Sequence, residues 1–243
     1  MRVLVTRPEP GASRTAARLA QAGHVPILLP LTEIHGVEAL PPSEIDEAQA
    51  VVITSANALR FAADSLVASL RGKPCFAVGP RTADLARSRG FADVTAGPGD
   101  ADGLADLVLR TTAPNALLAY LCGRLRRDTL ERALRSAGRH CIVIETYDTR
   151  DLDYTKENLC AVPGAEPIDA VLIYSAHAAE RLAVLWPFAP SAEPTELSTF
   201  ICISRRTAEP VTGTPGVKTM IAAEPHEDAM FALLCVAAKR AAC

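Results

Sequence analysis

Small polar residues follow an apolar run at two places in this chain, and the two places resemble each other. Ser55 opens the stretch Ser-Ala-Asn-Ala and Ser175 opens the stretch Ser-Ala-His-Ala, so that His177 matches Asn57. Where a strand passes into a helix, such small residues leave backbone N–H groups free to bind carboxylate or phosphate oxygens. The spacing therefore predicts anion binding at both junctions.

The repeat continues further along the chain. Thr82 and Thr207 each stand in Arg-Thr-Ala after an apolar run, and Gly103-Leu104 matches Ala229-Met230 at almost the same separation. We interpret the chain as a duplicated unit, and two facing copies would form a cleft for a polyanion. Helix capping is the more common use of small hydroxyls at such junctions, and ligand contact is the alternative for Ser55, Thr82, Ser175 and Thr207.

Arginines are concentrated where helices should begin. A helix N-terminus carries about half a positive charge, so a cation there costs roughly 0.3–1 kcal/mol unless an anion lies nearby. For any single arginine, a side chain exposed to solvent is an equally good explanation. Recurrence at four junctions favours a bound anion, and the residues concerned are Arg7, Arg81, Arg124, Arg126, Arg127, Arg205 and Arg206.

The composition argues against several function classes. Among 243 residues the net charge is −3 and aromatic residues make up 5%, which is unlike a nucleic-acid groove binder or a base-stacking protein. A Gly-x-Gly-x-x-Gly motif and a Walker lysine loop are both absent, so we expect no dinucleotide or nucleoside triphosphate site. The seven cysteines are widely spaced without a C-x-x-C motif, which predicts reduced, mostly buried thiols and no metal site.

The start of the chain and the length of its apolar runs indicate the cellular location. Met1-Arg2-Val3 enters a strand-like run directly, so we expect no signal peptide, and no apolar stretch is long enough to span a bilayer. We therefore expect a soluble, cytoplasmic protein without a membrane or nucleic-acid partner. No long exposed apolar stripe demands a second subunit, which predicts a monomer.

Short apolar runs rich in Val, Ile and Leu alternate with segments of helical periodicity, which predicts an α/β fold with doubly wound parallel sheets. The clearest helix is 57–71, and another runs from Arg127 to Ala137 with Gly138 as its left-handed end. Gly23 and Gly90 should end two others in the same way. Ten candidate strands would form two five-stranded sheets, at 2–6, 25–30, 50–54, 74–78, 92–95, 116–121, 141–146, 169–174, 199–203 and 217–221.

Two divisions of these strands are compatible with the periodicity. A sequential cut near Pro114 would place one copy on each side. A nested arrangement would make 37–146 a complete lobe inserted between 1–31 and 151–243, with the chain crossing between lobes near 32–36 and 147–150. The cluster of Pro, Ser and Glu at 187–198 is expected to be a loop.

Tyr147 is one of four tyrosines and falls in a crossing segment rather than on a helix face. Its hydroxyl could donate a hydrogen bond to a leaving group at neutral pH, because the ordinary pKa of a phenol is about 10. Packing between the lobes is the alternative use of such a side chain.

Several short motifs, taken in order, resemble the uroporphyrinogen-III synthase family from end to end. They are Val3-Leu4-Val5-Thr6-Arg7-Pro8, Ile53-Thr54-Ser55-Ala56-Asn57-Ala58, Val78-Gly79-Pro80-Arg81-Thr82-Ala83, Cys122-Gly123-Arg124 with Arg127, and Glu145-Thr146-Tyr147. The resemblance implies two flavodoxin-like lobes in the nested arrangement, joined by a two-stranded linker, with the active site in the cleft between them.

The resemblance also implies a reaction without a cofactor. The linear tetrapyrrole hydroxymethylbilane (preuroporphyrinogen), whose side chains carry carboxylates, would lose its terminal hydroxyl and close to uroporphyrinogen III with the last ring inverted. The one protein partner that this implies is hydroxymethylbilane synthase, which would hand over the hydroxymethylbilane that it produces. A non-catalytic two-lobed module that binds a polycarboxylate or phosphate is the alternative.

Carried over by position, Tyr147 looks like the family tyrosine that assists departure of the hydroxyl. The second copy departs from the family pattern, with Ser204-Arg205-Arg206-Thr207 where Gly-Pro-x-Thr is usual and Tyr174-Ser175-Ala176-His177 where Thr-Ser-Pro is common. The candidate substrate-binding residues from the junctions and the resemblance together are Arg7, Ser55, Asn57, Arg81, Thr82, Gly123, Arg127, Ser175, His177, Arg206 and Thr207.

Overall fold

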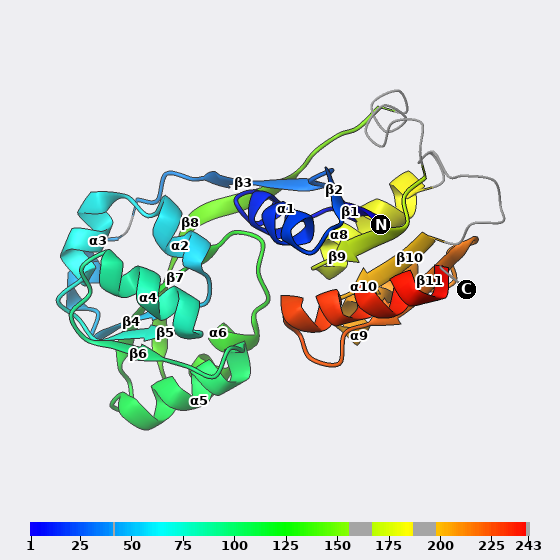
Figure 1. The fold of residues 1–243 in the computed structure, drawn as a ribbon. Coiled ribbons are helices and arrows are strands. Elements are labelled where there is room, and N and C mark those ends of the chain that lie inside the picture. The colour runs from blue at the N-terminus through cyan, green and yellow to red at the C-terminus, as the bar shows by residue number, and fades with distance from the viewer. Residues whose placement is uncertain (41, 156–166, 187–197, 242–243) are drawn as a thin grey trace. The chain divides into compact units, whose positions relative to one another are not determined.

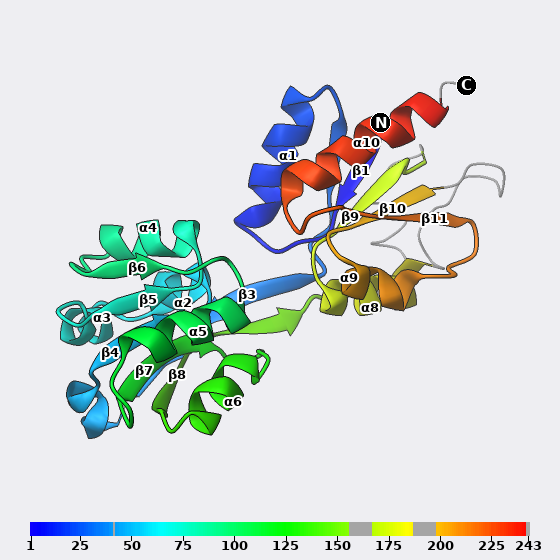
Figure 2. The same ribbon diagram turned by 90° about the horizontal axis from the view of Figure 1, so that it is seen from below.

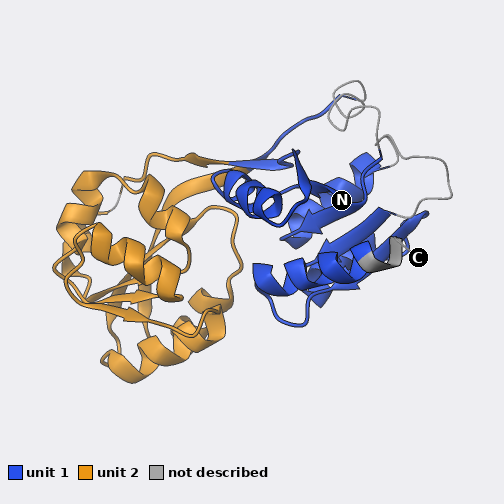
Figure 3. Ribbon diagram, viewed as in Figure 1, with its two compact units in different colours: residues 1–33, 150–243 blue, residues 34–149 orange. Residues whose placement is uncertain are grey.

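The computed structural model describes residues 1–40, 42–155, 167–186 and 198–241, so the expected loop at 187–198 lies almost wholly outside the described residues (Figure 1). The chain divides into two compact units (Figure 3). Unit 1 is Met1–Glu33 together with Arg150–Cys243, and unit 2 is the continuous segment Ile34–Thr149. Each unit contains one sheet covered by helices on both faces.

The sheet of unit 1 has five parallel strands in the order β11-β10-β9-β1-β2. Its strands are nearly continuous apolar runs, because both faces of a covered parallel sheet are buried. Alternate residues of one strand serve opposite faces, so that Leu4 packs on one side and Val3 and Val5 pack on the other. The strands are β1 (Arg2–Val5), β2 (Val25–Leu28), β9 (Ala170–Ile173), β10 (Ser198–Cys202) and β11 (Val217–Ile221).

The helices of unit 1 divide between the two faces (Figure 2). On one face α1 (Gly11–Gln21) and α10 (Glu227–Ala241) bury Leu19, Met230 and Leu234. The other face is covered by α8 (Ala176–Leu185), α9 (Arg205–Ala208) and η3 (Glu209–Val211). On this second face the rings of Trp186 and Phe200 meet edge to face, with their centroids 4.8 Å apart.

The sheet of unit 2 has six strands in the order β3-β8-β7-β4-β5-β6. One face is covered by η1 (Ser43–Glu47), α2 (Ala56–Phe61), α3 (Asp64–Leu70) and α4 (Pro80–Ser88), and the other by α5 (Ala101–Thr111) and α6 (Thr129–Ser136). The strands are β3 (Thr32–Gly36), β4 (Ala50–Ile53), β5 (Cys75–Ala77), β6 (Val94–Ala96), β7 (Leu117–Gly123) and β8 (His140–Asp151). The neighbours from β8 to β6 pair in parallel.

Strand β3 is an addition at the edge of this sheet. The N–H of Val37 donates to Thr146 and the N–H of Leu152 donates to Leu31, so the partner number falls as the residue number rises. The two strands therefore run antiparallel.

Without β3, the two units have the same strand order. The junction serines match β4 with β9, which makes β7 the counterpart of β1 and β8 the counterpart of β2. Unit 2 runs through β4, β5 and β6 before β7 and β8, whereas unit 1 begins with β1 and β2. The duplication is therefore cyclically permuted, and the loop at Arg7 corresponds to the loop that follows Gly123. A constant offset along the sequence cannot detect this pair.

Helix capping repeats between the units as well. Ser55 accepts a hydrogen bond from the N–H of Asn57 (3.2 Å), and Ser175 accepts one from Ala178 (3.1 Å). At the third matching pair, Asp100 accepts from the N–H of Gly103 (2.8 Å), while the Nδ1 of His226 accepts from Ala229 (3.2 Å). The interpretation of these residues as capping positions is confirmed for both serines.

Three expectations from the sequence are wrong in detail. The second sheet has six strands rather than five, because the polar tract expected as a crossing forms β3, an edge strand that needs no apolar run. The expected helix 57–71 is broken at Ala62 and Ala63, which are extended. Arg89 explains the break, since its guanidinium donates to the carbonyls of Leu59 and Ala62 and replaces helical hydrogen bonds there. The sixth helix begins at Thr129 rather than Arg127.

The expectations for three helix ends and for three of the cysteines are confirmed. Gly23, Gly90 and Gly138 have positive φ angles at helix ends. Cys75, Cys122 and Cys202 are buried, although Cys235 is exposed and Cys160 and Cys243 lie outside the described residues. None of the described helices is both long enough and apolar enough to cross a membrane, and the described residues include no metal-binding group of three or more His, Cys, Asp or Glu side chains.

Candidate active site

Each sheet has one point where its strand order reverses. In unit 1 this point lies between β1 and β9, whose following helices α1 and α8 pack on opposite faces. In unit 2 it lies between β7 and β4, which are followed by α6 and α2. Ligands of open α/β sheets bind beside such points, at the carboxyl ends of the strands. The strand ends there, with the residues that follow them, carry Arg7 and Ser175 in unit 1, and Ser55 and Gly123 in unit 2.

A β-bulge aims Tyr147 at the switch point of unit 2. Cys122 pairs with Glu145, but the next residue, Gly123, pairs with Tyr147, so β8 contains one extra residue, Thr146. The Thr146 hydroxyl is fully buried and donates to the carbonyl of Ala58 in α2 (2.8 Å). Bulges of this kind re-aim a side chain and are common beside active sites.

The ring of Tyr147 lies directly on Gly123. A Cβ atom at Gly123 would stand 2.5 Å from Cζ of Tyr147 and 2.9 Å from its hydroxyl oxygen, which is closer than any side chain allows. Phe61 approaches the same ring with a centroid distance of 6.3 Å. Gly123 therefore makes room for the tyrosine at this position.

Burial raises the pKa of the Tyr147 phenol above its ordinary value, and the Ser55 side chain acts in the opposite direction. The net pKa is raised, so Tyr147 keeps its proton at neutral pH and can act as a proton donor. The neighbouring Asn57 bonds through Oδ1 to Nη1 of Arg60 (2.6 Å).

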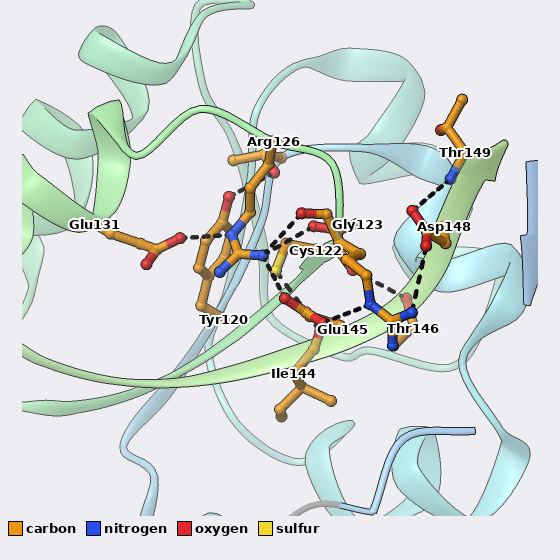
Figure 4. Close-up of polar contacts among 12 residues, drawn as sticks. Tyr120, Cys122, Gly123, Arg126, Glu131, Ile144, Glu145, Thr146, Asp148 and Thr149 are labelled. Carbon is orange, nitrogen blue, oxygen red and sulfur yellow. Dashed lines mark hydrogen bonds and ion pairs between the residues drawn. The ribbon is translucent and has the colours of Figure 1, made fainter. Parts of the chain in front are cut away.

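The loop after Gly123 holds two arginines in ion pairs (Figure 4). Arg126 lies between Glu131 (2.6 Å) and Glu145 (2.7 Å) and also donates to the carbonyl of Gly123. Arg124 contacts Glu145 and Asp148 (3.2 and 3.3 Å). The hydrogen bond from Arg126 holds the pKa of the Glu145 carboxyl below its ordinary value. The anions that these two arginines require are thus supplied by the protein itself.

A surface cavity of about 410 Å³ opens beside this network within unit 2. Its walls include Glu38, Arg124, Arg126 and Glu145. Because both arginines are already paired with carboxylates, the charge of these walls is largely balanced.

Other arginines at the junctions remain available. Arg81 at the start of α4, Arg127 before α6, and Arg205 and Arg206 in α9 are exposed, and none forms an ion pair with another described residue. Their neighbours Thr82 and Thr207 are buried, at 5% and 4% exposure. The hydroxyl of Thr207 bonds to the capping residue Ser204 (2.9 Å).

Arg7 in unit 1 has an internal partner far away in the sequence. Its Nη1 lies 3.2 Å from Oε1 of Glu227, the first residue of α10, and its guanidinium stacks 4.2 Å from the centre of the Tyr174 ring. The same carboxylate accepts hydrogen bonds from Thr15 (2.6 Å), Tyr174 (2.7 Å) and Arg18. This cluster joins β1, α1, β9 and α10 at the switch point.

The carboxyl of Glu227 stays ionised in this cluster. Burial would raise its pKa, but the hydrogen bonds from Thr15, Tyr174 and Arg18 and the charge of Arg7 lower the pKa below its ordinary value. Sequence reasoning missed Glu227, although an acidic residue in the first turn of an amphipathic helix was the available signal.

Ser175 and His177 lie at the other side of the unit 1 switch point. Ser175 is exposed and caps α8. The Nε2 of His177 lies 2.6 Å from Oδ1 of Asp151, which also contacts Arg181. The structure thus brings Gly123 and Tyr147 into contact in unit 2, and places Arg7, Ser175 and His177 just after the neighbouring strands β1 and β9 of unit 1.

A glycine comparison tests the contact beneath Tyr147. We expect Gly123→Ala to destabilise the protein by about 1–3 kcal/mol, because the added methyl group forces the tyrosine ring to move. Gly72→Ala is the matched control, since a Cβ there meets no atom within 4 Å. Urea unfolding measures both changes, and equal effects would contradict the proposed packing.

Acid unfolding tests the Glu227 cluster. Because the folded-state pKa lies below the unfolded value, near 4.5, the ionised carboxylate stabilises the protein above that pH, and this contribution disappears as the pH falls through the folded-state pKa. We expect Glu227→Gln to lower the Tm at neutral pH and to flatten the loss of Tm on acidification. The exposed Glu47→Gln is the control. Parallel curves of Tm against pH for Glu227→Gln and the unaltered protein would argue against the cluster.

Comparison with known proteins identifies relatives of this chain. Residues 13–232 match the family model described as uroporphyrinogen-III synthase HemD. Uroporphyrinogen-III synthase of Saccharomyces cerevisiae is 28% identical over 127 residues, which are 46% of this chain and 46% of the yeast protein. The match thus spans about half the length of this curated relative.

Solved structures resemble the fold. The uroporphyrinogen-III synthetase of Helicobacter pylori superposes with a TM-score of 0.67 at 17% identity, over 97% of this chain and 99% of that one. A mutant uroporphyrinogen III synthase of Thermus thermophilus gives a TM-score of 0.57 at 17% identity, over 99% of both chains. These likenesses support the α/β fold, and the family model extends over most of the sequence. The chain belongs to the uroporphyrinogen-III synthase family.

Proposed function

We propose that this protein converts hydroxymethylbilane to uroporphyrinogen III, with loss of water and inversion of the last pyrrole ring. Membership of the family supports this proposal. The observation that carries the chemistry is the phenol of Tyr147, which a β-bulge aims at a switch point and which keeps its proton at neutral pH.

Tyr147 is the proposed catalytic residue. As the bond from carbon to the terminal hydroxyl breaks, the electron pair of the pyrrole nitrogen replaces it and gives an electrophilic azafulvene. The phenol proton passes to the departing oxygen, which leaves as water. The proton that the substrate loses when its rings become aromatic again returns to the tyrosinate, so the enzyme ends unchanged.

Ring inversion depends on how the chain of pyrroles is held. The substituted carbon of the last ring attacks the azafulvene, and the spiro intermediate that forms then fragments and closes again in the inverted order. The protein's contribution is to hold these atoms in contact, so that the entropy of bringing them together is lost on binding rather than in the reaction step. Spontaneous closure without that constraint gives the isomer that is not inverted.

The substrate's carboxylates are the proposed partners of the exposed junction residues. Arg81, Arg127 and Arg206 carry charges that no described carboxylate neutralises, which supports their use as anchors. We assign carboxylate contacts also to the half-buried or exposed side chains of Asn57, Ser175 and His177. Four other candidates are buried or already paired within the protein, so we assign them to holding these junctions in place. They are Arg7, Thr82, Gly123 and Thr207.

Hydroxymethylbilane synthase is the proposed supplier of the substrate. A cytoplasmic location and a monomeric state remain predictions from the sequence.

Product analysis tests the function directly. Hydroxymethylbilane is generated in situ with its synthase, this protein is added, and the oxidised porphyrin isomers are separated. We expect an excess of the type III isomer over a control without the protein. Formation of type I alone would contradict the synthase and favour the non-catalytic binding module.

The role of Tyr147 has its own test. We expect Tyr147→Phe to lower kcat about tenfold or more while the fold is retained, because one positioned proton donor is lost. Tyr154→Phe removes a phenol that bonds to the carbonyl of Pro30 and serves as the control. An unchanged kcat in Tyr147→Phe would reduce Tyr147 to a packing residue.

A further inference from the structure

The bulge of β8 interrupts the strand ladder just before Tyr147. The register slips by one residue between Glu145 and Tyr147, and the extra residue, Thr146, has no partner in the ladder. A disrupted ladder constrains the residue that follows it less than a regular one does. The position of Tyr147 therefore depends on further contacts.

One nitrogen of Arg126 joins the two strands at the bulge (Figure 4). Its Nη1 donates to the carbonyl of Gly123 (3.1 Å) and to Oε1 of Glu145 (2.7 Å). The Tyr147 ring lies on Gly123, and Glu145 precedes Tyr147 by two residues in β8. The same guanidinium therefore contacts both the residue beneath the ring and the strand that carries the ring.

Arg124, from the same loop after β7, contacts β8 before, at and after Tyr147. Its backbone N–H donates to the carbonyl of Tyr147 (2.9 Å). Its side chain donates from Nε to Oε2 of Glu145 (3.2 Å) and from Nη1 to Oδ2 of Asp148 (3.3 Å). Each oxygen of the Glu145 carboxylate thus accepts from a different arginine, and hydrogen bonds between charged groups are stronger than neutral ones.

Burial distinguishes this network from an ordinary surface ion pair. The side chains of Arg126 and Glu145 are 22% and 34% exposed, whereas those of Arg132 and Asp128 beside α6 are 68% and 73% exposed. Water and salt weaken an exposed pair of the second kind, so it holds little structure in place. The pair at the bulge is better shielded, and its loss should have the larger structural effect.

We propose that Glu145 is a positioning residue for Tyr147, and that its carboxylate holds the bulge against the loop after β7 so that the phenol stays over Gly123. This inference rests on the proposed function, in which the phenol gives its proton to the departing hydroxyl. Glu145 stays ionised throughout, because the hydrogen bond from Arg126 lowers the pKa of its carboxyl. It transfers no proton, and it is no anchor for the substrate, since like charges repel.

The surface cavity beside the network provides a way to replace the Glu145 carboxylate. The walls of this cavity of about 410 Å³ include Arg124, Arg126 and Glu145. Glu145→Ala would therefore leave both guanidinium groups facing a space that small solutes can enter. Acetate supplies the carboxylate and the adjoining carbon that this substitution removes, so it can occupy the same position.

The experiment combines kinetics with NMR of protein labelled with ¹³C at tyrosine Cζ, in which Tyr147→Phe assigns the resonance. We expect Glu145→Ala to shift the Tyr147 resonance and to lower kcat about three- to tenfold at unchanged KM, because the phenol leaves its productive position. Acetate should restore the resonance and most of kcat, whereas sodium chloride at the same ionic strength should restore neither.

Two further variants separate positioning from general stability. Arg139→Gln removes an arginine of the same unit that donates to the carbonyls of Leu109 (3.0 Å) and Thr112 (2.9 Å). We expect it to lower the Tm but to leave kcat and the Tyr147 resonance unchanged. Glu145→Gln should lower kcat without rescue by acetate, because its amide fills the space, and it serves as the second variant if Glu145→Ala fails to fold.

Two results would overturn the inference. An unchanged Tyr147 resonance in Glu145→Ala would show that the carboxylate does not determine where the phenol lies. A raised KM at unchanged kcat would assign Glu145 to substrate binding instead. The NMR measurements need no substrate, so absence of type III product from the unaltered protein would count against the proposed function alone.

Discussion

Coverage of each sheet on both faces is the constraint on which the rest of the structure depends. It requires strands that are apolar throughout, such as Ala50–Ile53 and Ala170–Ile173, and leaves the ends of the strands as the places where polar groups gather. At the switch points the connections leave toward opposite faces, so two loops separate there. Arg7, Ser55 and Ser175 lie on those loops because the sheet permits polar chemistry at few other positions.

Patterns among neighbouring residues predicted the features that depend on local interactions, namely strands, helix starts and helix ends. The apolar runs marked ten strands, the serines marked two helix starts, and Gly138 marked a helix end. Contacts between distant segments decided the rest. Arg89 ends α2 from another helix, and Glu227 reaches Arg7 across 220 positions, so no window of sequence contains the cause. The close approach of Gly123 to Tyr147 depends likewise on a bulge that periodicity does not reveal.

Arginines at helix starts proved to be of two kinds. Arg7, Arg124 and Arg126 have carboxylate partners within their own unit and hold loops in place. Arg81, Arg127 and Arg206 have no such partner among the described residues. The same residue type in the same local setting therefore serves architecture in one case and is available for recognition in the other. Burial and pairing separate the two uses, and residue type alone does not.

The cyclic permutation has a consequence for biosynthesis. Unit 2 is one continuous segment, so all the strands of its parallel core emerge from the ribosome together. In unit 1, β1 and β2 emerge before unit 2, whereas β9, the other neighbour of β1, emerges after it. The side chain of Asp169 beside β9 bonds to the N–H of Arg2 across 167 positions. A sequence separation of this size slows folding, because the chain loses the conformational entropy of closing a long loop before the stabilising contacts form. During translation the inserted half thus becomes ordered while the half that encloses it still lacks β9, the central strand of its sheet.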